Sequence, residues 1–146
     1  MGRAGRARRI FRDEDQELEQ PSSERRGSKL RVLIVEDRRL ARRALRSILE
    51  LDGCEVRTAG DGSRAMTVMN TFDPQVVIMD WRMPGLSGER LCREIRRRKP
   101  DLPIIVVSSS EEAFSSGVQV SARLRKPIDV RRLRAAVSAQ RPGAAG

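Results

Sequence analysis

Three carboxylates, a hydroxyl and an amine stand at the carboxyl ends of predicted strands in this 146-residue chain. In chain order they are Glu36, Asp37, Asp80, Ser108 and Lys126. Carboxylates that lie close together raise one another's pKa, and a Mg²⁺ ion held by a few carboxylates and water resolves that conflict. A carboxylate can also act as a nucleophile and form an aspartyl phosphate, whose charge Mg²⁺, an amine and a hydroxyl would neutralise. Gathered in one place, these residue types suit phosphoryl transfer.

The apolar runs predict the strands that would gather these residues. Residues 30–35, 75–79 and 104–107 are short segments dominated by apolar, β-branched residues, which favours strands buried on both faces. Residues 54–58 alternate between apolar and charged side chains and predict a half-buried strand, and a short fifth strand is centred on Leu124. Helical spacing separates the strands, with Ser87 and Asp129 as expected N-caps and Gly53 as a left-handed C-cap.

This alternation of strand and helix, repeated five times, predicts a flavodoxin-like α/β fold of three layers, (βα)5. Its five-stranded parallel sheet should have the order 2-1-3-4-5 with right-handed crossovers. In such a sheet the chemistry lies at the carboxyl ends of the strands. Strands 1, 3, 4 and 5 are neighbours in this order, so the five side chains should meet at one edge of the sheet.

The composition excludes several classes of protein. The chain has no histidine, which excludes Ser-His triads and His-ligated metals, and its two cysteines, Cys54 and Cys92, are expected to be free thiols of a reducing cytosol. No apolar run is long enough to cross a bilayer, and the basic N-terminus lacks the apolar segment of a signal peptide. We therefore expect a cytoplasmic protein without membrane insertion, whose net charge of +10 reflects solvated, arginine-rich helix faces.

A change in composition near Lys29 divides the chain. Residues 1–28 hold three large apolar residues among many charged ones, too few to offset the entropy of ordering. We therefore expect a disordered N-terminal tail that the chemistry does not need. Residues 29–141 form the predicted domain, and residues 142–146 form a flexible C-terminal tail.

Four segments of the chain, VLIVED, VVIMDWRMPGLSG, PIIVVSS and LRKPI, resemble the receiver domain of bacterial two-component response regulators, over about residues 29–140. The resemblance implies that Asp80 is the phosphoacceptor, that Lys126 contacts the phosphoryl group and that Ser108 is the switch hydroxyl. It also implies a Mg²⁺ site whose ligands are Glu36, Asp37, Asp80 and the backbone carbonyl of Arg82.

The resemblance further implies a signalling protein whose only catalysis is its own Mg²⁺-dependent phosphorylation and dephosphorylation. A histidine kinase or phosphotransfer protein would supply the phosphoryl group. The face made by the fourth helix, the fifth strand and the fifth helix would then signal to a downstream protein, with a homodimer through that face as a further option. Because no further domain pattern follows residue 140, the chain resembles the stand-alone, chemotaxis-type members. A cis peptide bond between Lys126 and Pro127 is also implied.

One position departs from the family pattern and bears on how the signal leaves the domain. The family usually has Tyr or Phe three residues before the lysine, where this chain has Arg123. Because an unpaired buried charge is strongly destabilising, we expect Arg123 to point outward into a basic patch with Arg125, Arg131 and Arg132. The signal should then be the ordering of residues 108–117, which hold a short fourth helix.

Three other functions compete with this hypothesis. A phosphorylation-independent, receiver-like scaffold is supported by Arg123 and the basic surface, but not by the clustered acids. A phosphohydrolase of the haloacid dehalogenase kind would need a second Asp where Arg82 stands. An anion- or nucleic-acid-binding module could use arginine stripes on two predicted helices, but no aromatic residues interleave them, so nucleic acid is not the expected partner. The stripes are Arg38, Arg42 and Arg46, and Arg90, Arg93 and Arg97.

Overall fold

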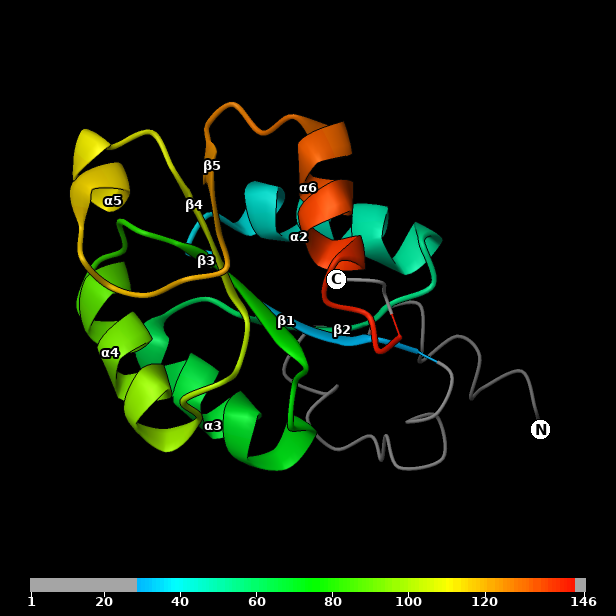
Figure 1. Cartoon of the computed structure of the whole chain (residues 1–146), viewed down its shortest axis with the longest axis horizontal. Helices are drawn as coiled ribbons and strands as arrows, with labels where there is room; N and C mark the ends of the chain where they lie inside the picture. Colours follow the sequence, from blue (N-terminus) through cyan, green and yellow to red (C-terminus); the bar gives the residue numbers. More distant parts are fainter. Residues whose placement is uncertain (1–28, 144–146) are drawn as a thin grey trace.

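Parallel strands and helices alternate along residues 29–143, the part of the chain that this computed structural model describes (Figure 1). The elements, in chain order, are β1 Arg31–Val35, α2 Arg39–Leu51, β2 Glu55–Ala59, α3 Gly62–Phe72, β3 Val76–Asp80, α4 Gly88–Arg98, β4 Ile104–Ser108, α5 Glu111–Ser115, β5 Ala122–Arg125 and α6 Val130–Ser138. The tail predicted over residues 1–28 lies outside the described residues, as does most of the predicted C-terminal tail.

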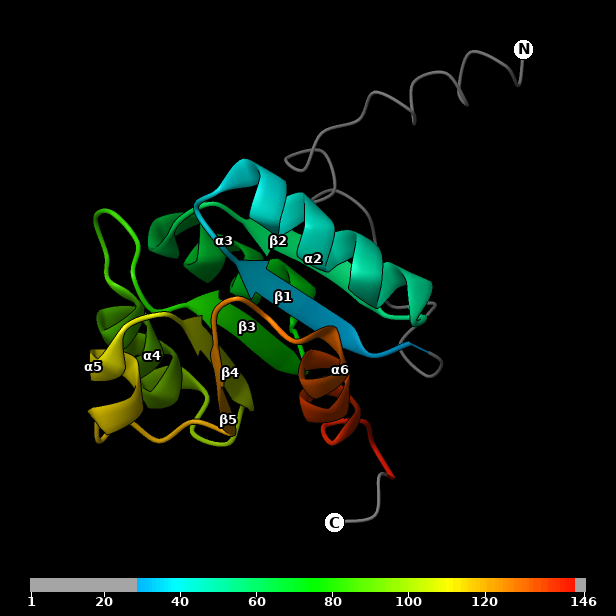
Figure 2. The same cartoon turned by 90° about the horizontal axis from the view of Figure 1, so that it is seen from above.

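The five strands form one parallel sheet in the order β2-β1-β3-β4-β5. Helices α2 and α6 cover one face of this sheet, while α3, α4 and α5 cover the other (Figures 1 and 2). The flavodoxin-like fold and the strand order predicted from the sequence are therefore confirmed. Strand order matters for function because it places the ends of β1, β3, β4 and β5 side by side.

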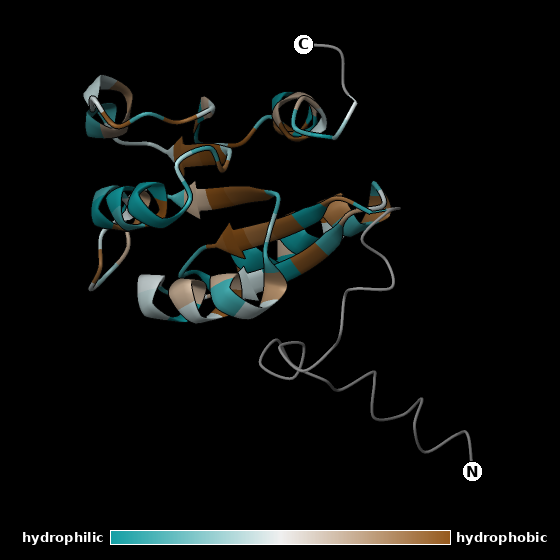
Figure 3. Ribbon diagram, turned by 60° about the horizontal axis from the view of Figure 1, so that its bottom comes forward, coloured by the Kyte–Doolittle hydropathy of each residue, from teal (hydrophilic) through white to brown (hydrophobic). Residues whose placement is uncertain are grey.

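Two apolar cores, one on each face, hold the sheet rigid. Strands β1, β3 and β4 are buried along their whole length, and Figure 3 shows the strands mostly in the colour of hydrophobic residues. On one face, Phe72 of α3 and Ile95 of α4 are fully buried, and on the other, Leu49 of α2 and Leu133 of α6 are buried. Burying apolar surface on both sides stabilises these strands, so their carboxyl ends are fixed in space.

The helix ends follow the capping pattern expected from the sequence. The side chains of Ser87 and Asp129 accept hydrogen bonds from backbone amides in the first turns of α4 and α6, which confirms both predicted N-caps. Asp61 caps α3 in the same way. Gly53, directly after α2, has φ +88°, the left-handed conformation predicted for it. No helix within residues 29–143 is long and apolar enough to cross a membrane.

Strand β2 departs from the prediction of a half-buried strand. Arg57, expected on its solvated face, is only 5% exposed, and its guanidinium carbon lies 4.9 Å from the centre of the Phe72 ring. The ring of α3 thus covers the arginine, and the contact between cation and ring offsets part of the cost of removing the charge from water. Alternation of residue types predicted the strand correctly but not the burial of this face.

Candidate functional site

The five side chains expected to act together lie at one edge of the sheet. Asp80 and Ser108 are the last residues of β3 and β4. Glu36 and Asp37 follow β1 directly, and Lys126 follows β5 directly. Because these four strands are neighbours, the sequence prediction that their carboxyl ends converge is confirmed. Glu36 is 3% exposed, Asp80 8% and Ser108 2%, so polar atoms here sit against the core with little water to screen them.

The three acidic side chains form a cluster that fits a divalent cation. One carboxylate oxygen each from Glu36, Asp37 and Asp80 lie within 4.8 Å of one another. Two oxygens bound to one Mg²⁺, each about 2.1 Å from it, are at most about 4.2 Å apart, so a small contraction would bring all three within reach of one ion. Hard carboxylate oxygens are also the donors that Mg²⁺ prefers. The residues present therefore suit the ion that the sequence predicted.

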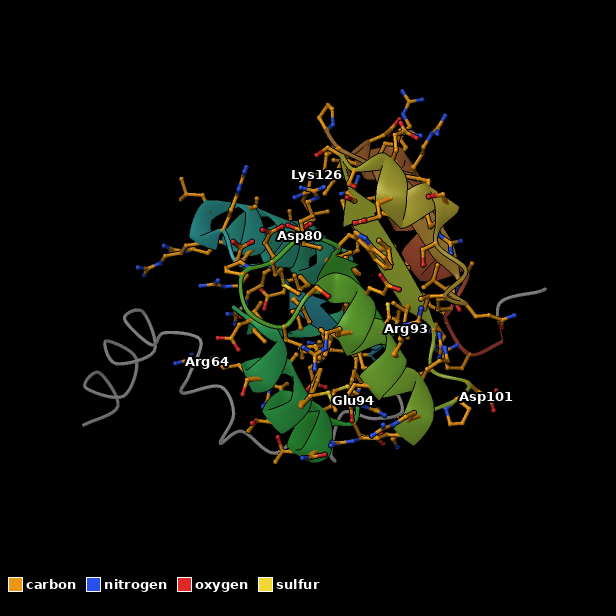
Figure 4. The ribbon with its side chains drawn as sticks, turned by 90° about the vertical axis from the view of Figure 1, so that its left-hand side faces the viewer. Arg64, Asp80, Arg93, Glu94, Asp101 and Lys126 are labelled. Carbon is orange, nitrogen blue, oxygen red and sulfur yellow. The ribbon has the colours of Figure 1, made fainter. Side chains whose placement is uncertain are left out.

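The ammonium group of Lys126 bridges two of these acids. Its Nζ lies 3.1 Å from Asp80 Oδ2 and 3.6 Å from Glu36 Oε1. Figure 4 shows Lys126 and Asp80 next to one another at this edge of the molecule. The Lys126–Pro127 peptide bond is cis, as the family resemblance implied. The lysine thus partly neutralises the carboxylate that the sequence singled out as a nucleophile.

Backbone amides hold the carboxylates in place. The amide of Arg82 donates to Asp80 Oδ1 at 3.2 Å, and the amide of Arg38 donates to Glu36 Oε2 at 3.0 Å. Burial raises the pKa of Glu36, the amide of Arg38 opposes that rise, and the charge of Asp80 adds to it. Each carboxylate therefore keeps one oxygen fixed by the backbone and the other turned toward Lys126.

The hydroxyl of Ser108 takes part in the turn that follows β4. Its Oγ accepts a hydrogen bond from the amide of Ser110 at 2.9 Å, while its carbonyl accepts one from the amide of Lys126 at 3.1 Å. Ser110 is the N-cap of α5, so the hydroxyl is linked directly to the start of that helix. The structure thus connects the predicted switch hydroxyl both to the lysine segment and to α5.

Two residues support the site although the sequence did not point to them. Gly88, the first residue of α4, lies so close to β3 that an added Cβ would stand 2.5 Å from the Trp81 carbonyl oxygen and 2.7 Å from that of Asp80. Arg42 of α2 donates from its guanidinium to the Glu36 carbonyl at 3.0 Å. The expected N-cap Ser87 predicted that a helix starts at this point. The close approach of the α4 and β3 backbones, however, leaves no pattern in the local sequence.

A pocket of about 440 Å³ lies beside the site, between the β3–α4 loop and the start of α5. Its lining residues are Trp81, Arg82, Met83, Pro84, Ser87, Glu89 and Glu112. Trp81 is 3% exposed and directly follows Asp80. Its indole is therefore well placed to report changes at the acidic cluster by fluorescence.

The arginine stripes seen in the sequence are partly engaged in contacts along their own helices. On α4, Arg93 pairs with Glu89 at 2.7 Å and Arg97 with Glu94 at 3.0 Å, and Figure 4 shows Arg93 and Glu94 away from Asp80. Ion pairs at these spacings are typical of solvated helix faces and contribute little to stability. Both cysteines are free and buried, and burial raises the pKa of Cys92 to about 11.

The prediction that Arg123 points outward into a basic patch is wrong. Its guanidinium is half-buried and donates to the carbonyls of Ala113, Ser116 and Val118 at 2.9, 3.2 and 2.6 Å. The sequence argument assumed that no partner could reach the buried charge, but these backbone carbonyls supply three. Residues 111–115 are already helical as α5, so the expected ordering of the whole segment has no basis in this structure.

Arg125, the second member of the predicted patch, is also engaged with α5. It forms a two-pronged ion pair with Glu111, at 2.9 and 3.2 Å, and its guanidinium carbon lies 4.1 Å from the centre of the Phe114 ring. Both arginines of β5 therefore contact α5, although the Arg125 side chain stays exposed to solvent. Of the four patch members, Arg125, Arg131 and Arg132 are exposed as predicted, and only Arg123 is not.

Comparison with known proteins agrees with the fold. The family model of the response regulator receiver domain matches residues 32–138, and the chain belongs to this family. Members are, in general, signalling domains of two-component systems that accept a phosphoryl group. The receiver protein of Pseudomonas putida has 31% sequence identity and a TM-score of 0.70, covering 75% of this chain and 96% of that one. A receiver domain from Clostridium thermocellum has 26% identity and a TM-score of 0.71, covering 76% and 93%.

Among curated proteins, the chain is similar to Response regulator MprA of Mycolicibacterium vanbaalenii. The two are 37% identical over 82 residues, which are 56% of this chain and 36% of that protein. The chain thus matches about a third of the length of this relative. Family membership therefore applies to the receiver domain, and the wider activity of the relative is not carried over to this chain.

Proposed function

We propose that Asp80 accepts a phosphoryl group in a Mg²⁺-dependent reaction, with the phosphoryl group coming from a histidine kinase or phosphotransfer protein. One observation carries this proposal: Lys126 Nζ lies 3.1 Å from Asp80 Oδ2, and the Asp80 carboxylate clusters with those of Glu36 and Asp37. Asp80 lies closer to the lysine than Glu36 does, at 3.1 Å against 3.6 Å. It is also the acid that ends a central strand, so its carboxylate faces outward from the edge of the sheet.

Each residue has a role that follows from its place. Glu36, Asp37, Asp80 and the backbone carbonyl of Arg82 would hold Mg²⁺, which when bound supplies positive charge to the phosphoryl oxygens. Asp80 attacks phosphorus through the carboxylate oxygen, and the donor's leaving group departs on the opposite side. Lys126 neutralises charge on the product, and Ser108 donates a hydrogen bond to a phosphoryl oxygen. The amides of Arg38 and Arg82 keep the two carboxylates oriented throughout.

The finer proposal is that the domain acts as a stand-alone regulator whose phosphorylated form is recognised by a protein partner. The face made by α5, β5 and α6 supports it, because Ser108 connects the site directly to α5. A pull-down with and without beryllofluoride, which mimics a phosphoryl group on Asp80, tests this step. A partner that binds equally in both conditions would favour a phosphorylation-independent scaffold instead.

The phosphorylation itself is tested with acetyl phosphate and Mg²⁺. Intact mass and Phos-tag mobility should show one phosphoryl group on the wild-type chain and none on Asp80→Asn. Asp101→Asn is the matched control, because Asp101 is exposed and lies away from the site (Figure 4), and it should be phosphorylated normally. Retention of the label in Asp80→Asn would contradict the proposal.

A further inference from the structure

Arg123 joins β5 to the end of α5 in a way that neither a solvated arginine nor an aromatic residue could. It lies in β5 opposite Val106 of β4. From there its guanidinium donates to the carbonyls of Ala113, Ser116 and Val118. A half-buried cation is costly unless its donors are used, and a planar guanidinium can serve several carbonyls at once. The three hydrogen bonds therefore form a specific contact between the guanidinium and these carbonyls, rather than a chance approach of a long side chain.

Helix α5 needs such a contact because it is only five residues long. A helix of this length is not stable by itself in water, and its last carbonyls have no partner within the helix. The three carbonyls that bind Arg123 belong to this last turn and to the loop after it. A cation at a helix C-terminus also interacts favourably with the helix dipole. Arg123 thus closes the C-terminal end of α5.

A second arginine fixes the loop that follows α5. The Nε and one terminal nitrogen of Arg96 in α4 donate to the Gln119 carbonyl at 3.2 and 3.1 Å. The other terminal nitrogen donates to the Leu102 carbonyl at 2.8 Å. Val118, whose carbonyl accepts from Arg123, is also buried in the core. The segment after α5 is therefore held from both α4 and β5.

The N-terminal end of α5 is held differently, by hydrogen bonds to the candidate site and by the exposed ion pair of Glu111 with Arg125. Ser108 Oγ accepts from the amide of Ser110 at 2.9 Å, and Ser110 Oγ accepts from the amide of Glu112 at 3.2 Å. These two neutral hydrogen bonds form a chain from the last residue of β4 to the first turn of the helix. A phosphoryl group that draws the Ser108 hydroxyl away from the amide of Ser110 would break the first link of this chain.

We propose that Arg123 is a positioning residue that keeps the last turn of α5 fixed in both phosphorylation states, so that the signal from Asp80 releases only the first turn. This inference rests on the proposed function for its trigger, but not for the anchor itself. The helix then pivots about its C-terminal end rather than ordering or melting as a whole. The moving part is the Ser110–Glu112 end, which also borders the pocket beside Trp81.

Amide hydrogen exchange of the full chain, measured by NMR with and without beryllofluoride, tests this inference. The reporters at the anchored end are the amides of Ser116 and Val118, which are bonded to the Glu112 carbonyl and to Ser116 Oγ. In the wild type, beryllofluoride should speed exchange at Ser110 and Glu112 and leave Ser116 and Val118 unchanged. In Arg123→Ala, exchange at Ser116 and Val118 should rise at least about tenfold before any addition, since three charge-assisted bonds are lost.

Two further variants make the result specific. Arg125→Ala removes the same charge from the same strand but leaves the three carbonyl contacts, so Ser116 and Val118 should exchange as in the wild type. Arg123→Lys keeps the charge but has a single nitrogen for three carbonyls, so its exchange should fall between wild type and Arg123→Ala. The lysine variant also decides the matter should the alanine variant fail to fold.

The outcomes separate this inference from the proposed function. If neither beryllofluoride nor acetyl phosphate modifies Asp80, the proposed function is contradicted. Amide hydrogen exchange in Arg123→Ala, measured without any addition, still tests whether Arg123 fixes the last turn of α5. Normal phosphorylation with unchanged exchange at Ser116 and Val118 in both Arg123 variants would overturn the inference. The inference would also be overturned if beryllofluoride sped exchange equally at both ends of α5 in the wild type. Arg123 would then not keep the last turn of the helix fixed.

Discussion

The acidic edge of β1 and β3 and the α5–β5 side of the domain hold their polar residues in opposite ways. At the acidic edge, side chains extend from strands that are buried on both faces, and backbone amides orient the carboxylates. On the α5–β5 side, a helix of five residues is held by side chains that reach across to it, chiefly Arg123 and Arg125. One region is positioned by the sheet, the other by individual contacts.

The difference corresponds to two different physical needs. A reaction centre works when its groups are held in a fixed geometry, because misplacement of a reacting atom lowers the rate steeply. A segment that transmits a change must instead have a low local stability, with few contacts that can be broken one at a time. Polar side-chain contacts to backbone carbonyls supply such separable links, whereas a buried strand does not.

The largest effect should come from removing a metal-binding carboxylate at the rigid edge. Asp37→Ala deletes one of three clustered oxygen donors, and we expect Mg²⁺ affinity to fall at least about 100-fold, the upper end of what the loss of a supporting group costs. Mg²⁺ titration followed by the fluorescence of Trp81 measures it. Asp101→Ala, on an exposed loop, is the control and should bind Mg²⁺ normally. Equal affinities would move the metal site away from this edge.

Alanine substitutions at two glycines, one in each region, would compare how tightly the two regions are packed. In Gly88→Ala the new Cβ meets backbone oxygens of Asp80 and Trp81 that cannot move aside, so we expect a loss of about 2 kcal/mol in the free energy of unfolding. In Gly117→Ala nothing lies within 4 Å of the new atom, and the change should stay within about 0.5 kcal/mol. Urea denaturation measures both. Similar losses in the two variants would mean that the regions are equally tightly packed.

The smallest effect concerns the exposed ion pair of α5 with β5. The hydrogen bond from Arg125, together with its charge, lowers the pKa of Glu111 from its ordinary value of 4.5. A depressed carboxyl pKa means that the pair contributes stability above about pH 4.5 and loses it as the pH falls through the lower folded-state value.

Arg125→Ala should therefore return the Glu111 pKa to its ordinary value, as an NMR titration of the side-chain carboxyl would show. Arg131→Ala removes an exposed arginine of α6 and should leave that pKa unchanged. Added salt should weaken the shift in the wild type, since the pair is fully exposed. If the Glu111 pKa changes neither with added salt nor in Arg125→Ala, then charge does not hold α5 at this point.

The sequence predicted the acidic edge well because its logic is local. Each site residue stands at the carboxyl end of a predicted strand, and the strand order then places those ends side by side, so Asp80 and Lys126 could be paired without knowing any contact. Arg123 and Arg57 could not be placed in this way. The partners that make their burial tolerable are backbone carbonyls of α5 and the ring of Phe72, which the pattern of neighbouring residue types does not reveal.

The bridging position of Lys126 affects the formal charge that a cation at the acidic edge would have to balance. With formal charges on the three carboxylates and on the one ammonium within 4 Å of two of them, the cluster carries −3 + 1 = −2. A monovalent ion would leave this cluster half compensated, whereas a single divalent ion balances it. In this arrangement Lys126 would lower the charge that a bound cation has to balance, and charge balance would favour a divalent ion over potassium.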